Sequence, residues 1–133
     1  MLKRILDTNL LINHWCARLQ GKRVQDVTTD MARRWAEELR YLQGSASILT
    51  PIYLEFVCGA RSAIELKLAR SFLAAFTIAD GGEVLFSDWE EARRIAERVP
   101  RDGLPRQMGD CLIRSICKRL RMEVITAEKR FPR

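Results

Sequence analysis

Short apolar runs alternate along the chain with longer segments in which apolar residues recur at helical spacing. A short apolar run bounded by polar residues is typical of a buried strand, and it predicts strands at 4–6, 45–50, 83–86 and 123–126. The longer segments predict helices over 10–19, 28–44, 51–60, 62–76, 87–99 and 110–120. We expect Trp35 and Trp89 to lie on the core side of their helices.

Two of the predicted helices begin with a serine that is followed three residues later by a glutamate. Ser62 with Glu65, and Ser87 with Glu90, therefore predict capping boxes. In this motif the hydroxyl accepts a hydrogen bond from a backbone N–H of the first turn, and the carboxylate accepts one in return. Pro51 fits the first turn of the helix over 51–60. These signals place helix starts at 51, 62 and 87.

Strands that alternate with helices predict a parallel sheet, because parallel strands need crossover connections. No repeat, low-complexity tract or linker interrupts the alternation, and 133 residues are enough for one hydrophobic core. We therefore expect a single α/β domain over residues 1–133, with helices on both faces of the sheet.

Basic residues are concentrated in the last third of the chain. Of a formal net charge of +6, residues 93–133 contribute +7, from twelve lysines and arginines against five acids. Clustered basic charge attracts polyanions such as nucleic acids, although it is also found on solvated helix faces. We expect some of the following residues to contact RNA phosphates: Arg101, Arg106, Lys118, Arg119, Arg121, Lys129, Arg130 and Arg133.

The cysteines and the single histidine do not form a recognisable zinc site. The four cysteines include no CxxC pair, and His14 has no histidine partner, so reduced structural thiols are expected. Cys111 and Cys117 are expected to pack in the core. No segment has the length and composition of a signal peptide or a membrane span, which predicts a cytoplasmic protein.

Four acids follow or flank the carboxyl ends of predicted strands. Asp7 ends the first strand, Glu55 lies about a turn into a helix that follows a strand, Asp110 begins the last helix, and Glu128 follows the last strand. Because the carboxyl ends of parallel strands share one edge, we expect these acids to meet there. Thr126 would lie near the same cleft.

Clustered carboxylates repel one another, and a divalent cation removes the conflict. An all-oxygen site suits Mg²⁺ or Mn²⁺, which keep several waters and share their coordination with substrate phosphate. Such ions activate water and stabilise the leaving oxygen in an in-line displacement. The predicted site would therefore support hydrolysis of a phosphodiester bond.

Four motifs in this order resemble the PIN domain, in particular the VapC-type ribonuclease toxins of toxin–antitoxin pairs. They are "ILDTNLLI", "LTPIYLEFVCGA", "MGDCLIRSICKRL" and "VITAEKRF", which together span residues 4–131. The resemblance implies a Rossmann-like α/β/α sandwich around a central parallel sheet, and metal-dependent endonucleolytic cleavage of RNA. It implies that Asp7, Glu55 and Asp110 bind the metal. It also implies a homodimer, and a cognate antitoxin whose C-terminal segment covers the acidic groove.

Two positions depart from the family pattern. Where the family's last motif has Asp or Asn and then a further Asp, this chain has Glu128 and Arg130. Glutamate reaches farther than aspartate, and arginine cannot bind metal. The helix after Asp110 has Arg114 and Ser115 where the family has small residues, so Arg114 would face solvent or a phosphate.

Each site residue also has a purely structural interpretation. Asp7 could belong to a turn, with Thr8 orienting it or capping the next helix; Asp110 could be an N-cap, and Glu55 and Glu128 could be surface acids. Two other functions remain open. A phosphatase of the haloacid dehalogenase kind is disfavoured by Asn9, which stands where its second aspartate is required. A catalytically weak or inactive PIN-like module that binds RNA or a partner is the main alternative.

Overall fold

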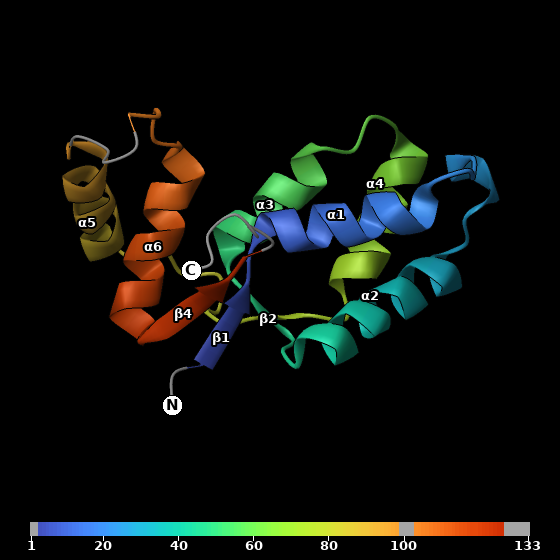
Figure 1. Ribbon diagram of the computed structural model, residues 1–133, viewed down its shortest axis with the longest axis horizontal. Helices are drawn as coiled ribbons and strands as arrows, with labels where there is room; N and C mark the ends of the chain where they lie inside the picture. The colour runs from blue at the N-terminus through green and yellow to red at the C-terminus, as the bar shows by residue number, and fades with distance from the viewer. Residues whose placement is uncertain (1–2, 99–102, 127–133) are drawn as a thin grey trace.

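The strands pair in parallel in the computed structural model, which describes residues 3–98 and 103–126 (Figure 1). Strand β1 (Lys3–Leu6) pairs with β4 (Met122–Ile125), and β2 (Ser47–Ile48) pairs with β3 (Thr77–Ile78). The two pairs lie side by side, and the Ser45 hydroxyl just before β2 donates to the Arg4 carbonyl in β1 at 2.7 Å. The carboxyl ends of β1 and β4 consequently share one edge.

Helices lie on both sides of these strands. In Figure 1, α5 and α6 lie beyond β4, whereas α1 to α4 gather on the opposite side of β1. The helices have these bounds: α1 Thr8–Leu19, α2 Thr29–Gln43, α3 Thr50–Cys58, α4 Ala63–Leu73, α5 Phe86–Ala96 and α6 Met108–Leu120, with a 3₁₀ turn η1 at Val24–Asp26. The predicted α/β fold with a parallel sheet is confirmed. No helix among the described residues combines the length and apolarity needed to cross a membrane.

One of the four predicted strands is wrong. Residues 83–85 form no strand, and Phe86 begins α5. The reason is that most of this apolar run lies outside the core: Leu85 is 39% and Phe86 76% exposed, and only Val84 packs against the core. The strand lies instead at Thr77–Ile78, directly after the turn that ends α4.

Helix capping agrees with the prediction in part at α4 and differs at α5. The Ser62 hydroxyl accepts a hydrogen bond from the Glu65 N–H at 3.1 Å, as predicted, but the Glu65 carboxylate accepts the Arg61 N–H at 3.1 Å instead of completing the box with Ser62. At α5 the capping box over Ser87 and Glu90 is wrong, because both residues lie inside the helix. The buried carboxylate of Asp88 instead accepts the Leu85 N–H at 2.9 Å.

The core is one apolar cluster that the strands share with the helices on both sides. Its fully buried members include Ile5, Leu6, Ile48, Phe72 and Ile116. An aromatic group of Trp15, Trp35, Phe56 and Phe72 packs at centroid distances of 5.1–6.3 Å within it.

Two tryptophans predicted to face the core have different outcomes. Trp35 is buried as expected, but Trp89 is 51% exposed, so the expectation for Trp89 is wrong. Helix α5 buries Asp88, Ala92 and Ile95, which share one face, and Trp89 falls outside that face. The buried face of α5 therefore includes a polar residue and leaves its tryptophan half exposed.

Candidate functional site

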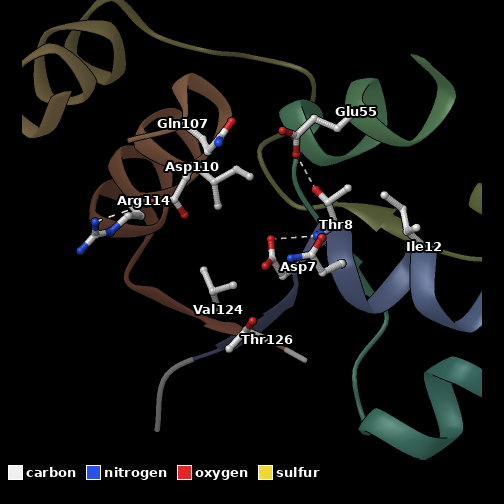
Figure 2. Close-up of a pocket in the computed structure, with 11 residues that line it drawn as sticks. Asp7, Thr8, Ile12, Glu55, Gln107, Asp110, Arg114, Val124 and Thr126 are labelled. Carbon is white, nitrogen blue, oxygen red and sulfur yellow. Dashed lines mark hydrogen bonds and ion pairs between the residues drawn. The ribbon is translucent and has the colours of Figure 1, made fainter. Parts of the chain in front are cut away.

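An open pocket lies at the edge where β1 and β4 end (Figure 2). The elements that line it come from both ends of the chain, because the parallel pairing of β1 with β4 brings them together. Its lining residues are Asp7, Thr8, Asn9, Ile12, Glu55, Gln107, Asp110, Ile113, Arg114, Val124 and Thr126. Three of the four acids predicted from sequence are therefore in one pocket.

Asp7 connects the sheet to helix α1. Its N–H donates to the Ile125 carbonyl at 3.0 Å, which extends the β1–β4 pairing by one residue. Its side chain is the N-cap of α1, where Oδ1 accepts the Thr8 N–H at 2.8 Å. The positive end of the helix dipole favours a negative charge at this position. The half-buried Asp7 is thus held by the sheet and by α1, with its carboxyl group at the pocket.

The charge of Asp7 also affects the pKa of a buried thiol. Burial, together with the nearby Asp7 carboxylate, raises the pKa of the Cys117 thiol to about 11. Cys117 is 5% exposed, and with Cys111 it packs in the core as expected. The thiol behind the pocket is therefore protonated at neutral pH, and it is not a nucleophile there.

Glu55 enters the pocket from α3, on the side opposite β4. Its Oε1 accepts a hydrogen bond from the Thr8 hydroxyl at 2.5 Å (Figure 2). Thr8 is buried, whereas Glu55 is exposed. The sequence predicts that Thr8 orients Asp7 or caps α1, but its hydroxyl instead links the start of α1 to the side chain of Glu55.

Asp110 lies in the first turn of α6, where the N-cap is Gln107. The interpretation of Asp110 as the N-cap is therefore wrong. Its side chain is 59% exposed, and Arg114, one turn later, lies 3.9 Å from Oδ2 with 52% of its own side chain exposed. Arg114 is the one basic residue among the described residues that line the pocket. It lines the pocket with half of its side chain exposed, and its expected contact with a phosphate stays a prediction.

The three acids share the pocket without forming a closed metal shell. Among residues 3–98 and 103–126, no three His, Cys, Asp or Glu side chains are close enough together to hold an ion. Glu128 and Arg130 lie outside the described residues, and Thr126 lines the pocket. The donors are all oxygen, which fits a hard divalent cation that keeps several of its waters.

Several important residues were not found from sequence. Gln107 lines the pocket, and the buried Asp88 binds Arg119 through two hydrogen bonds of 2.7 and 2.8 Å. Burial alone would raise the pKa of Asp88, but the Arg119 hydrogen bonds and the Leu85 N–H together hold it below its ordinary value. Arg119, which was expected to contact RNA phosphate, thus forms an ion pair with Asp88. Asp88 and Arg119 are 31 residues apart in the sequence, so no local pattern predicts their contact.

The family model of the PIN domain matches residues 4–133. The match covers nearly the whole chain, and the chain belongs to the PIN domain family. Searches of curated proteins and of solved structures returned no match. PIN domains are generally metal-dependent nucleases, so membership indicates a nuclease-type function and RNA binding.

Proposed function

We propose that this protein is an endoribonuclease that uses Mg²⁺ or Mn²⁺ to hydrolyse RNA phosphodiester bonds. The observation that carries the proposal is the convergence of Asp7, Glu55 and Asp110 on one open pocket of a PIN domain. These residues come from three elements that are far apart in sequence, and each leaves carboxylate oxygen near the pocket. The RNase reading also agrees with the net charge of the last third of the chain.

In the proposed mechanism, Asp7, Asp110 and Glu55 would together hold the cation through their carboxylate oxygens. When bound, the cation supplies an activated water and neutralises charge on the phosphate. Glu128 is proposed as a fourth, outer acid. Arg114 binds a phosphate of the RNA, because a half-exposed guanidinium held only at 3.9 Å from Asp110 can turn toward an anion.

We further propose that the protein is the toxin of a toxin–antitoxin pair and acts in the cytoplasm as a homodimer. The four motifs that resemble the VapC-type toxins support this role. The four free cysteines agree with a reducing compartment. An antitoxin would inhibit the enzyme by covering the open acidic pocket.

One observation favours a second candidate, a PIN-like module that binds RNA and does not cut it. The acids of the described chain are not assembled into a closed cluster, and Arg114 competes with a cation for Asp110. In such a module, the pocket would bind a phosphate through Arg114 alone. The two candidates differ in whether divalent metal changes the RNA.

The decisive experiment is cleavage of RNA by the purified protein with Mg²⁺ or Mn²⁺. The samples to compare are the wild type, the wild type with EDTA, the double variant Asp7→Asn/Asp110→Asn, and the control Asp30→Asn. Asp30 is a surface acid whose side chain is 77% exposed, outside the pocket. We expect cleavage only in the metal-loaded wild type and the control. Cleavage that survives EDTA and the double substitution would refute the proposal, and binding without cleavage under every metal would favour the module.

The toxin role needs a separate test in cells. Induced expression of the wild type should arrest growth, and the Glu55→Gln variant should not. Growth arrest that persists in this variant at equal protein levels would contradict a role for the site in toxicity.

A further inference from the structure

Gly109 lies in the first turn of α6, directly before Asp110, and the carboxylate of Glu55 occupies the space where a side chain would be. A Cβ atom added to Gly109 would lie 2.2 Å from Glu55 Oε2 and 3.0 Å from its Cδ. Real Cβ atoms do not make contacts that short. The carboxylate of Glu55 therefore packs against the backbone of α6 only because residue 109 is glycine.

The backbone itself does not require glycine at this position. Five other described glycines have positive φ angles, which L side chains rarely adopt, whereas Gly109 has helical geometry. Glycine is also among the least favourable residues in a helix. Within the described chain, Gly109 is the one glycine whose missing side chain is replaced by a carboxylate from another element.

We propose that Gly109 is a positioning residue for Glu55. The Thr8 hydroxyl holds one carboxylate oxygen from the α1 side, and the bare backbone at Gly109 admits the other on the α6 side. Together they fix the Glu55 carboxylate in the pocket that Asp110 also lines, where it can help to bind a divalent cation. The inference rests on the proposed function only in that a metal is bound. It states that the position of the Glu55 carboxylate is set by a residue that has no side chain.

Substitution of Gly109 by alanine has opposite consequences for the fold and for the site. Glu55 is exposed and its side chain has several rotatable bonds, so it can turn into solvent and relieve the clash, at the expense of its hydrogen bond with Thr8. Alanine favours the helix. The Gly109→Ala protein should therefore unfold at the wild-type temperature or above it, while the Glu55 carboxylate leaves the pocket and its hydrogen bond with Thr8 is lost.

The test measures three quantities on the full chain: Mn²⁺ affinity by calorimetry, the melting temperature, and the carboxyl ¹³C NMR signal of Glu55 in the metal-free protein. For Gly109→Ala we expect Mn²⁺ affinity to fall by about tenfold or more, in the range seen for residues that orient metal ligands. The Glu55 signal should shift, and the melting temperature should not fall. Met108→Ala is the matched control, since Met108 is adjacent, 82% exposed and outside the pocket.

A double substitution separates positioning from other effects. In a Glu55→Gln background, Gly109→Ala should cause a much smaller further loss of Mn²⁺ affinity, because the charge that it displaces is gone. Thr8→Val, which removes the other restraint, should shift the Glu55 signal as well. An unchanged Glu55 signal in Gly109→Ala overturns the proposal whatever the wild type does with Mn²⁺. A wild type that binds no Mn²⁺ overturns the proposed function instead, and the NMR signal still decides whether Gly109 positions Glu55.

Discussion

Two aspartates, Asp88 and Asp110, meet the same helix, α6, in opposite ways. Asp88 is 1% exposed, and Arg119 of α6 and the Leu85 N–H satisfy its carboxylate. Asp110, in the first turn of α6, is 59% exposed, and its charged neighbour Arg114 stands at 3.9 Å. One carboxylate is fully partnered within the protein, and the other leaves most of its hydrogen-bonding capacity open.

The comparison distinguishes a carboxylate that stabilises the fold from one that is available to bind a ligand. A carboxylate whose partners are all protein groups joins α5 to α6 and contributes to folding. A carboxylate that leaves its oxygens to solvent contributes little to folding and is free to bind a cation or a substrate. Substitutions at the two positions should accordingly affect different measurements.

The largest effect is expected from Asp88→Ala. It leaves the Arg119 guanidinium without its partner, and breaking such a pair costs about 3 kcal/mol of unfolding free energy, at the low end because Arg119 is 27% exposed. Urea denaturation would measure this. Because the folded pKa of Asp88 is depressed, its contribution is present above pH 3.8 and is lost as the pH falls below that value.

The control for Asp88→Ala is Asp30→Ala, which removes an exposed ion pair with Arg33. Its cost should stay within about 0.5 kcal/mol. Equal losses in the two variants would contradict the contrast between a buried and an exposed pair. The difference between wild type and Asp88→Ala should also shrink toward acid pH.

The next effect is expected from Asp110→Asn. Cleavage of RNA should fall about a hundredfold or more, since a metal contributes several kcal/mol to the transition state and each tenfold is about 1.4 kcal/mol. The unfolding free energy should change by less than about 0.5 kcal/mol, because the side chain is exposed. A loss of activity that only follows unfolding would show that Asp110, like Asp88, serves the fold.

An intermediate effect concerns Cys117 and alkaline pH. Its folded pKa of about 11 lies above the ordinary value of 9.0, so above pH 9 the unfolded chain releases this proton more readily than the folded one. Its stabilising contribution is complete below pH 9 and is lost as the pH rises through about 11, a change of roughly 2–3 kcal/mol. Unfolding free energies across this range should fall more steeply for the wild type than for Cys117→Ala. Parallel curves would contradict the prediction.

The smallest effect is expected from Arg114→Ala. If Arg114 contacts one RNA phosphate, the slope of binding affinity against salt concentration should decrease by about 1, and affinity should drop a fewfold at low salt. Arg93→Ala is the matched control, because Arg93 also pairs with an acid four residues away, Glu97, and lies outside the pocket. Equal slopes for the two variants would remove Arg114 from the RNA contact.

Sequence patterns predicted the parts of the fold that have a local cause. The strand at 4–6 and the helix over 110–120 follow directly from apolar periodicity, and the Ser62 cap follows from one hydroxyl. The strand Thr77–Ile78 was missed because Thr77 is exposed and Ile78 only half-buried, so this segment is not a buried apolar run. The apolar run at 83–86 was misread because its side chains remain partly or mostly outside the core.

The acids of the candidate site could be predicted from the sequence, but the contacts that hold them in place could not. The carboxyl-edge rule for parallel sheets brought Asp7, Glu55 and Asp110 together correctly. The contact of Thr8 with Glu55 joins residues 47 apart, and the close approach of Glu55 to Gly109 depends on how α3 and α6 pack. Neither contact can be recognised from the spacing of residues along the sequence.

The parallel pairing of β1 with β4 also determines when, during synthesis of the chain, the pocket can first form. Asp7 leaves the ribosome before residues 108–126, which supply Asp110 and the strand that pairs with β1. A nascent chain that lacks these residues has neither the second wall of the pocket nor the Ile125 carbonyl that accepts the Asp7 N–H. The acidic pocket is thus not assembled until residues 108–126 have been translated, next to the RNA of the ribosome.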